Sequence, residues 1–260
     1  MYILDNAAEQ AADRFDALAS ILDGGTIQHL EARRMERGWA CLEVGAGGGS
    51  IARWLANRVG PDGYVLATDI DIRHLEQARG DNLEVRRHNI ETDSLPESAF
   101  DLVHVRLVLS HLQSSAEAAA KMIAALKPGG WLVVEDFDSA DIDNAAYQVP
   151  KTAAVVRQLL AAGGVDLAAG RQLLARLLAS RLAEVETEGR LWVWRGGSAG
   201  ARLMRSNYLQ FREQILSTGR VSVAEFEADL ARLGDPDLLM ASPTMWTAWG
   251  RRPTSQSYPS

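Results

Sequence analysis

The sequence has almost no cysteine, because Cys41 is the only one among 260 residues. An intrachain disulfide is therefore excluded, and so is a zinc site built from several cysteines. A chain of this length buries enough apolar surface to fold without either kind of cross-link. Cys41 lies in a short apolar run, residues 41–44, so we expect a buried strand residue rather than a reactive thiol.

Clusters of positive charge are also missing. The chain has 27 basic and 34 acidic residues, which gives a formal net charge of −7. The densest basic spots are three arginine pairs, at 33–34, 86–87 and 251–252, and none extends into a run. Proteins that bind nucleic acid usually have a basic face that contacts phosphates. The sequence therefore predicts that the substrate is not nucleic acid.

Long hydrophobic runs and a signal sequence are absent as well. No apolar stretch reaches the roughly 18 residues that a membrane-spanning helix needs. The first ten residues, MYILDNAAEQ, lack the basic segment and apolar core of a signal peptide. These absences predict a cytoplasmic protein without a membrane partner. The oligomeric state is left open, with a homodimer as one option.

Between residues 40 and 137 the chain contains a regular alternation of short apolar strands and helices. The strand patterns lie at 41–44, 63–68, 83–87, 100–105 and 131–135, and the helical patterns at 50–59, 72–78 and 116–126. Two further strand patterns follow at 182–194 and 240–250. Strands that are apolar along most of their length indicate a parallel sheet covered by helices on both faces. We therefore expect one doubly wound α/β domain over residues 1–260.

Residues 1–37 are expected to form a helical lid at the N-terminus. Asn6 and Glu9 have the spacing of a capping box, and apolar residues then recur at three- and four-residue intervals. The glycine pair at 24–25 is expected to end this helix. A second short helix is predicted from residue 26 to about residue 37.

Further helical patterns follow the core, at 140–181 and 198–233. We expect these segments to be cap insertions over the edge of the sheet where α/β proteins bind ligands. Aromatic and methionine side chains in this half of the chain suit an apolar pocket, although core packing explains them equally well. They are Tyr147, Met204, Tyr208, Phe211 and Trp246. The polar tail at 253–260 is expected to be mobile.

A glycine-rich loop follows the first strand of the core, with the sequence EVGAGGGS at residues 43–50. Such a loop lets the backbone turn tightly and lets a ligand approach the main chain beside a helix N-terminus. Read from Gly45, the spacing is G-x-G-x-G, and Ser50 stands where the dinucleotide fingerprint has its third glycine. No glycine loop followed by Lys and Ser or Thr occurs, which excludes a P-loop.

The acid and glycines of residues 43–49 resemble motif I of the class I S-adenosylmethionine (SAM)-dependent methyltransferases. Three further features occur in the order of that family: Asp69 after the second strand, residues 89–96 before the fourth, and the LKPGG turn at 126–130. Each is weak alone, but the ordered set is specific. The resemblance covers about residues 40–137, and it implies a SAM-binding core there. It also implies a Rossmann-like seven-stranded sheet whose last strand is antiparallel.

The resemblance implies roles in cofactor binding for the loop and for the end of the second strand. Glu43 would help to order the methionine end of SAM, although it could instead pair with an arginine or the backbone. The glycines Gly45, Gly47 and Gly49 would line the path of that end. Asp69 would accept hydrogen bonds from the ribose hydroxyls, as an acid does for NAD too, or would cap a helix.

Five more residues are expected near the cofactor. Ile70 would pack on the adenine, and Ile90 would place its backbone N–H near the ring. Asn89 departs from the Asp that the family most often has, but its amide oxygen can still accept from the adenine amine. Arg106 would lie near the methionine carboxylate, although a substrate contact or a surface position is equally compatible. Tyr2 would close over SAM together with the first helix.

No obligatory catalytic signature is visible in the sequence. The methyl group of SAM is already activated, so the protein need only align the acceptor and exclude water. His111 is the best candidate for a general base, with a packing or capping role as its alternative. Asp136 and Asp138 could bind an acceptor hydroxyl, an amine or a metal, unless they form a solvated loop. The nearby Asp141 and Asn144 lack the spacing of a metal site, so we expect no metal.

The sequence therefore predicts a SAM-dependent methyltransferase acting on an oxygen, nitrogen or carbon atom of a small molecule, in specialised metabolism. A helical cap suits a small acceptor that becomes enclosed. A SAM-binding protein that acts as a cyclase, a decarboxylase or a ligand sensor would have the same loop and stays an alternative. A third hypothesis is a NAD-dependent oxidoreductase, which would bind NAD better than S-adenosylhomocysteine (SAH).

Overall fold

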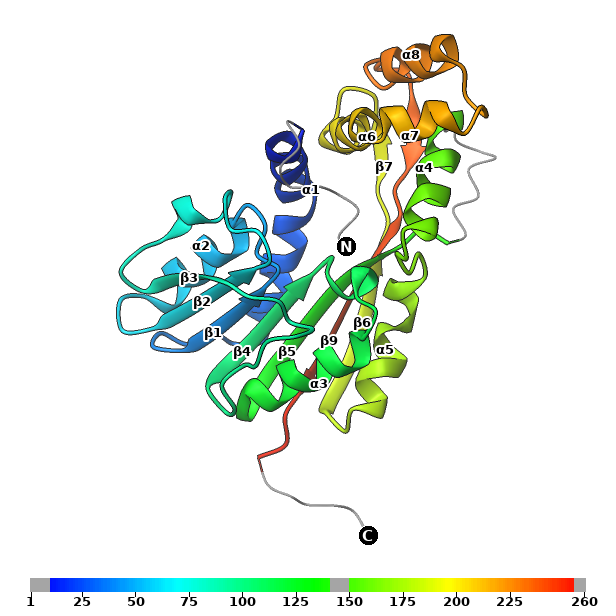
Figure 1. Cartoon of the computed structure of the whole chain (residues 1–260). Helices are drawn as coiled ribbons and strands as arrows, with labels where there is room; N and C mark the ends of the chain where they lie inside the picture. The colour runs from blue at the N-terminus through cyan, green and yellow to red at the C-terminus, as the bar shows by residue number, and fades with distance from the viewer. Residues whose placement is uncertain (1–9, 141–149, 255–260) are drawn as a thin grey trace.

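A computed structural model describes residues 10–140 and 150–254 (Figure 1). In these residues, seven strands form one sheet in the order β3-β2-β1-β4-β5-β9-β6. The strands are β1 (Ala40–Val44), β2 (Tyr64–Asp69), β3 (Leu83–Arg87), β4 (Phe100–Arg106), β5 (Leu126–Asp138), β6 (Ala183–Arg190) and β9 (Thr244–Arg251). β9 is antiparallel to its neighbours β5 and β6, and the other pairs are parallel. The expected α/β sheet with an antiparallel last strand is confirmed.

Helices cover both faces of this sheet, as the apolar strands predict. The helices are α1 (Ala11–Ala32), α2 (Ser50–Val59), α3 (Ser115–Ala125) and α5 (Ala169–Ala179). On one face, α3 and α5 pack on side chains such as Leu42 and Val103. On the other face, α2 and the second half of α1 pack on the alternate side chains, such as Cys41 and Leu102. Cys41 is fully buried, as expected, and burial raises the pKa of its thiol.

The first helix is longer than the sequence predicts. α1 runs unbroken through Gly24 and Gly25, so the expected second helix is its continuation. Glycine inside a helix costs about 1 kcal/mol relative to alanine. Packing offsets this cost, because the first half of α1 contacts the cap and the second half the sheet core. Beside the glycines, Asp23 and Thr26 also accept hydrogen bonds from Arg106.

A cap of helices stands beyond the carboxyl ends of the parallel strands (Figure 1). It contains α4 (Lys151–Ala162), α6 (Ala199–Gln210), α7 (Arg212–Ser217), α8 (Val223–Arg232) and a ribbon of β7 (Val193–Arg195) and β8 (Leu239–Ala241). The cap has its own apolar core, which includes Trp194, Phe226 and Met240 together with Ala17 of α1. Through α1, this second core is joined to the sheet.

Several predicted elements are divided in the structure. The strand expected at 182–194 separates into β6 and β7, and the strand expected at 240–250 into β8 and β9. The segment after β6 and the segment before β9 leave the main sheet side by side. They stay paired through Trp192 and Ser242, which exchange hydrogen bonds. The helical segment expected at 198–233 divides into α6, α7 and α8. Sequence patterns could not show this transfer from sheet to cap, because both parts have strand character.

The cap insertion predicted at 140–181 also divides into two parts. α4 belongs to the cap, whereas α5 packs on β5 and β9 of the main sheet. A Cβ at Gly170 would lie 2.7 Å from the carbonyl oxygen of Asp136, so glycine allows this close approach. The helix predicted at 72–78 shrinks to a short 3-10 turn, η1 (Glu76–Ala78).

Some expectations fall outside the described residues. They concern Tyr2, Asn6, Glu9, Asp141, Asn144, Tyr147 and the tail from residue 255 onward. Within residues 10–140 and 150–254, no helix has both the length and the apolar character needed to span a bilayer.

Candidate active site

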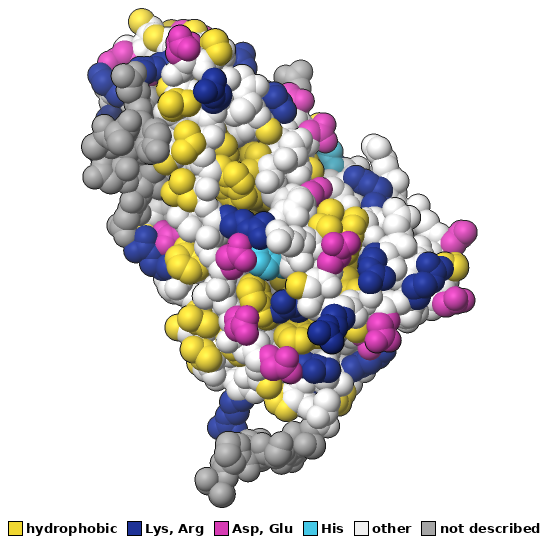
Figure 2. All heavy atoms as spheres, turned by 180° about the vertical axis from the view of Figure 1, so that it is seen from behind, with side chains coloured by type: hydrophobic (Ala, Val, Ile, Leu, Met, Phe, Trp, Pro, Cys, Tyr) yellow, Lys and Arg dark blue, Asp and Glu magenta, His cyan; other side chains and the backbone are white. Residues whose placement is uncertain are grey.

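A cavity of about 590 Å³ lies between the carboxyl edge of the sheet and the cap. The glycine loop and the end of β2 line one end of it, and α4, α6, β7 and β8 line the other. Figure 2 shows hydrophobic side chains gathered in a hollow of the surface beneath the cap. A cavity of this size suits a small organic ligand or cofactor. We call its two ends the cofactor half and the cap half.

The glycine loop forms the floor of the cofactor half. Gly45 and Gly47 line the cavity with φ of 68° and 53°, a region that residues with a Cβ seldom adopt. A Cβ would also lie 2.2 Å from the side chain of Val108 at Gly45, and 2.8 Å from the ring of Phe15 at Gly47. Gly49 has φ of 75° and is the N-cap residue of α2. Both the backbone and its neighbours therefore require glycine at Gly45 and Gly47.

Asp69 lies at the end of β2 and lines the same half of the cavity. Its Oδ2 accepts from the Gly47 N–H at 2.9 Å, and its Oδ1 accepts from the Asp71 N–H at 3.0 Å. Burial raises the pKa of this carboxyl, and the two backbone hydrogen bonds act in the opposite direction. Because each oxygen has a second lone pair, Asp69 can still accept from two hydroxyl groups. These acceptor oxygens fit the hydroxyl groups of the ribose of SAM.

Ile70, Asn89 and Ile90 line the cavity beyond Asp69. The Ile70 side chain is 43% exposed, as suits a residue that packs on a ligand, whereas Ile90 is buried. Asn89 Oδ1 already accepts from the Glu91 N–H at 3.0 Å, which leaves one lone pair on that oxygen. The structure therefore brings the three residues together at one end, and their contacts with adenine stay a prediction.

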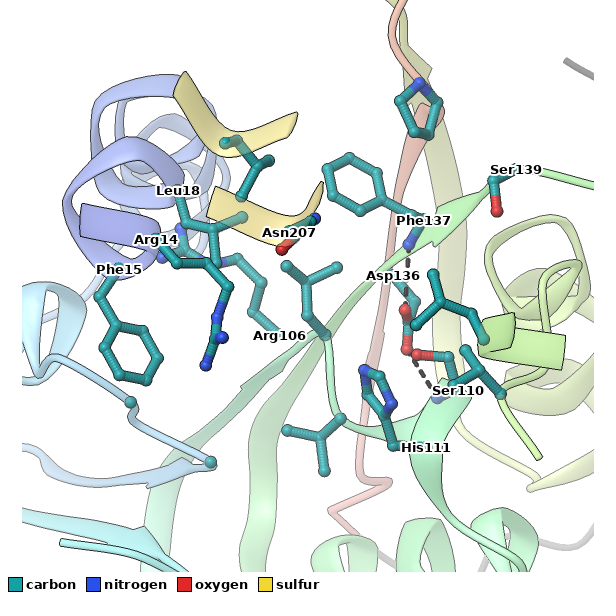
Figure 3. Close-up of a pocket in the computed structure, with 18 of the residues that line it drawn as sticks. Arg14, Phe15, Leu18, Arg106, Ser110, His111, Asp136, Phe137, Ser139 and Asn207 are labelled. Atoms are coloured by element: carbon teal, nitrogen blue, oxygen red, sulfur yellow. Dashed lines mark hydrogen bonds between the residues drawn. The ribbon is translucent and has the colours of Figure 1, made fainter. Parts of the chain in front are cut away.

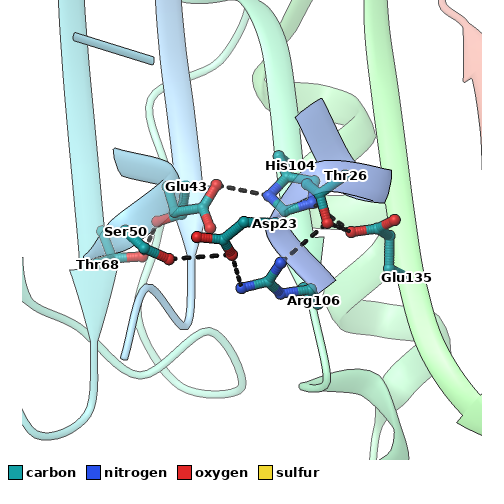
Figure 4. Close-up of polar contacts among 8 residues, drawn as sticks. All are labelled: Asp23, Thr26, Glu43, Ser50, Thr68, His104, Arg106 and Glu135. Atoms are coloured by element: carbon teal, nitrogen blue, oxygen red, sulfur yellow. Dashed lines mark hydrogen bonds and ion pairs between the residues drawn. The ribbon is translucent and has the colours of Figure 1, made fainter. Parts of the chain in front are cut away.

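Behind the loop, Glu43 is held by a buried histidine (Figure 4). His104 Nδ1 lies 2.6 Å from Glu43 Oε2, and its Nε2 lies 3.2 Å from Glu135 Oε2. A neutral imidazole carries one N–H, so a carboxylate at each nitrogen favours the cation. Burial opposes this charge, but the two carboxylates outweigh it and raise the pKa of His104 to about 9. Glu43 is not among the cavity-lining side chains, so any ordering of the methionine end by Glu43 would be indirect.

Arg106 lines the cavity, but its charge is already paired. Its guanidinium donates to Asp23 and to Thr26, both of α1, at 2.9 Å. Asp23 also accepts from the Ser50 hydroxyl, at 3.2 Å. Arg106 therefore ties the lid helix to β4 and to the start of α2 (Figure 4). A contact between Arg106 and the methionine carboxylate stays a prediction.

Two basic side chains, Arg14 and His111, point into the middle of the cavity (Figure 3). Arg14 belongs to α1 and is only 2% exposed, and His111 belongs to η2 (Leu109–His111) after β4. Burial, and then the positive charge of Arg14, lower the pKa of His111 to about 4. His111 is therefore neutral at pH 7, with a ring nitrogen able to accept a proton.

Asp136 lies beside η2, at the end of β5. Its Oδ2 accepts from the Ser110 N–H at 2.9 Å, and burial raises its pKa to about 6. Asp136 therefore holds the turn that carries His111. Asp138, by contrast, is ion-paired with Arg171. Among the described residues, no group of three or more His, Cys, Asp and Glu side chains could hold a metal ion.

The cap half is mostly apolar. Its lining includes Val156 and Leu160 of α4, Leu203 and Met204 of α6, Trp194 of β7 and Met240 of β8. Of the candidates from the sequence, Met204 and Tyr208 line the cavity, whereas Phe211 packs in the cap core. Trp246 packs against the sheet core instead.

Two side chains near the site were not predicted from the sequence. Arg14 lies three residues after Ala11 and four before Leu18, so a charge on the apolar face of a helix could have indicated it. His104 interrupts the apolar run of β4, which was a similar signal. A charged or polar side chain at a buried position needs a partner.

Residues 6–188, more than half of the chain, match the family model described as a methyltransferase domain. The chain belongs to this methyltransferase family. SAM is its cofactor, and the expected class I resemblance is confirmed.

Curated relatives match about half of the chain. The methyltransferase str2 of Strobilurus tenacellus is 36% identical over 153 residues, which are 55% of this chain and 54% of that protein. The ubiquinone/menaquinone biosynthesis C-methyltransferase UbiE of Hahella chejuensis is 30% identical over 156 residues, 54% of this chain and 63% of that protein. The match therefore spans less than two thirds of either relative.

Solved structures show the same fold at low sequence identity. Phosphoethanolamine N-methyltransferase 2 of Haemonchus contortus, solved with phosphomonomethylethanolamine and SAH, matches with a TM-score of 0.61 at 15% identity. This match covers 97% of the chain and 59% of that enzyme. The 4+2 cyclase SpnF matches with a TM-score of 0.52 at 19% identity, over 96% of the chain and 86% of that protein.

Proposed function

We propose that this protein transfers the methyl group of SAM to an oxygen, nitrogen or carbon atom of a small apolar molecule, in specialised metabolism. One observation carries the proposal: a single continuous cavity joins the cofactor half to an apolar cap half. The relative named as a C-methyltransferase of quinone biosynthesis is consistent with an apolar acceptor.

In this proposal the cofactor half holds SAM through main chain and one carboxylate. Backbone groups of Gly45 and Gly47 face the methionine part, Asp69 accepts from the ribose, and Ile70 and Ile90 enclose the adenine. The N-terminus of α2 adds unpaired N–H groups beside the loop. When bound, SAM supplies a methyl group on a positively charged sulfur, which needs no further activation.

His111 is the group that we assign to proton removal from the acceptor. It is neutral at pH 7 and lies between the cofactor half and the cap half (Figure 3). Asp136 is a positioning residue, because it accepts a hydrogen bond from the main chain of Ser110, next to His111. The lid helix α1 and the cap helices α4 and α6 exclude water from the acceptor, which favours alignment.

A second candidate keeps the cofactor but not methyl transfer. The 4+2 cyclase SpnF has a similar fold, so this architecture is compatible with a cyclase, a decarboxylase or a ligand sensor. The apolar cap half would serve such a reaction equally well. The two candidate functions differ in whether the methyl group of SAM is transferred to an acceptor.

The test follows SAH formation from SAM with a panel of apolar phenols, quinols, amines and enolic ketones. We expect SAH and one methylated product in equal amounts, and at least tenfold slower turnover for His111→Gln at unchanged SAH affinity. Wild-type protein that binds SAH but methylates nothing in the panel would favour the second candidate. A variant with normal turnover would remove His111 from the proposed role.

A further inference from the structure

Two polar side chains interrupt the apolar lining of the cap half. Asn207 and Tyr208 belong to α6, and both line the cavity. They follow Leu203 and Met204, which also line the cavity, by four residues each. Residues four apart in a helix lie on the same face. The side of α6 that meets the cavity therefore combines two apolar residues with two that carry hydrogen-bonding oxygens.

Both oxygens are buried without a partner. Tyr208 is only 1% exposed. Within the described part of the chain, neither the Tyr208 hydroxyl nor Asn207 Oδ1 has a hydrogen-bond partner. Figure 3 shows Asn207 among the side chains around the cavity, with Leu18 and Phe137 on either side of it in that view. Buried polar groups without partners are costly and rare, so we expect a molecule bound in the cavity to supply the missing partners.

The two oxygens need different partners. The amide oxygen of Asn207 can only accept a hydrogen bond, whereas the hydroxyl of Tyr208 can donate one. Burial, and then the negative charge of Asp229, raise the pKa of Tyr208, so the phenol keeps its proton at neutral pH. A hydroxyl group on a ligand satisfies both residues, because it accepts from Tyr208 and donates its own proton to Asn207.

A cation at the same end of the cavity raises the alternative of an anionic ligand. Arg157 of α4 lines the cavity, and a guanidinium favours a carboxylate. A carboxylate could accept from Arg157 and from Tyr208, but it has no proton to donate to Asn207 Oδ1. Arg157 is partly exposed, so water can hydrate its charge without a ligand. The two buried oxygens therefore favour a hydroxyl group over an anion.

We propose that Asn207 and Tyr208 together bind a hydroxyl group of the methyl acceptor and select hydroxylated apolar molecules. This inference rests on the proposed function and adds the polar group by which the acceptor is recognised. Asn207 and Tyr208 contact the acceptor from α6 in the cap, and His111 approaches it from η2 at the edge of the sheet. Contacts from two separate elements fix the orientation of the acceptor relative to the cofactor.

Fluorescence titration of three naphthalenes into SAH-saturated protein tests the proposal. 1-Naphthol has a hydroxyl group, 1-methoxynaphthalene has an oxygen without a proton, and naphthalene has neither. We expect the wild type to bind 1-naphthol about tenfold more tightly than the other two, although both are more apolar. Equal or weaker binding of 1-naphthol, or binding of none of the three, would overturn the proposal.

Two variants on α6 assign the preference to its residues. Asn207→Leu and Tyr208→Phe each remove one oxygen with little change of shape, so each should reduce the preference for 1-naphthol to less than about threefold. Naphthalene should bind both variants within about threefold of the wild type, which also verifies that they are folded. Full preference in either variant would overturn the assignment to a shared hydroxyl group.

Ser206→Ala is the matched control. Ser206 is a buried polar residue of α6 that does not belong to the cavity lining, so this variant should keep the full preference for 1-naphthol. Loss of the preference in Ser206→Ala would overturn the assignment, because any change in α6 would then have the same effect.

A fourth compound, 1-naphthoate, separates a hydroxyl group from an anion. We expect it to bind more weakly than 1-naphthol. Tighter binding of 1-naphthoate that is lost in Arg157→Gln would overturn the proposal in favour of an anionic acceptor. These titrations do not measure methyl transfer. Their failure would leave the proposed reaction intact, and an acceptor panel without product would leave the binding preference intact.

Discussion

The cofactor half of the cavity is made largely of main chain, whereas the cap half is made of side chains from four separate elements. Positive φ at Gly45 and Gly47 and the hydrogen bond from Gly47 to Asp69 determine the shape of the first half. Apolar packing among α4, α6, β7 and β8 determines the second. Backbone requirements leave a local sequence pattern, and packing between distant segments does not. The cofactor can therefore be inferred from the sequence, whereas the acceptor cannot.

The largest effect is expected from His104→Gln, which breaks the polar network of the cofactor half. The replacement cannot pair with Glu43 and Glu135 as a cation, and it leaves two buried carboxylates without their common partner. Removing one partner of a buried ion pair typically costs about 3–5 kcal/mol. Urea denaturation should show this loss in the free energy of unfolding.

A matched control is His74→Gln, which changes a histidine at the edge of the Phe15 ring and outside this network. It should cost less than about 1 kcal/mol. Similar values for the two variants would mean that the network does not stabilise the cofactor half.

The next effect in size concerns Asp69→Ala. This variant loses the carboxylate that accepts from Gly47 and, in our proposal, from the ribose. Each hydrogen bond to a charged group is worth about 1.5–3 kcal/mol, so SAH affinity should fall about a hundredfold. Calorimetry measures it, with Asp71→Ala as the neighbouring control. Unchanged SAH affinity would remove Asp69 from the site.

A smaller effect, on binding in the cap half rather than on SAH affinity, is expected from Met204→Trp. The larger side chain fills part of the apolar chamber, so binding of 1-naphthol, followed by its fluorescence, should weaken about tenfold. SAH affinity should stay within about twofold, because α6 does not form the glycine loop. Loss of SAH binding in this variant would contradict the division into two halves.

A pH dependence of stability is also expected to arise in the cofactor half. The folded-state pKa of His104 is raised to about 9 from an ordinary value of 6.5. The folded state therefore binds the proton more tightly, and this stabilisation is complete below pH 6.5 and lost as pH rises through 9. The free energy of unfolding should fall over that range in the wild type. In His104→Gln the fall should be reduced.

Much of the fold follows from local patterns. The strand at 41–44, the glycine loop and α2 lie where the sequence predicts them, because alternating apolar runs and a glycine turn are contiguous signals. The seven-stranded sheet with an antiparallel last strand follows from the family resemblance and is confirmed. The cap helices could be predicted from the sequence, but their positions in space could not.

The errors have a common physical cause in tertiary contacts. Gly24 and Gly25 continue a helix because both halves of α1 are packed, which propensity alone cannot reveal. The ion pair of Arg106 with Asp23 joins residues far apart in the sequence, so no local pattern could show it. Arg14 and His104 are buried by segments that lie far away in the sequence, so local patterns could not predict their surroundings.

In our proposal, the lid helix and the glycine loop together form the cofactor site, and α8 on the far side of the cap takes no part in it. Hydrogen–deuterium exchange with and without SAH tests this claim directly. SAH should protect backbone amides in α1, in residues 45–50 and in residues 69–71, and leave those of α8 unchanged. Protection confined to the cap, or no protection of α1 and the loop when SAH is bound, would contradict the proposed cofactor site.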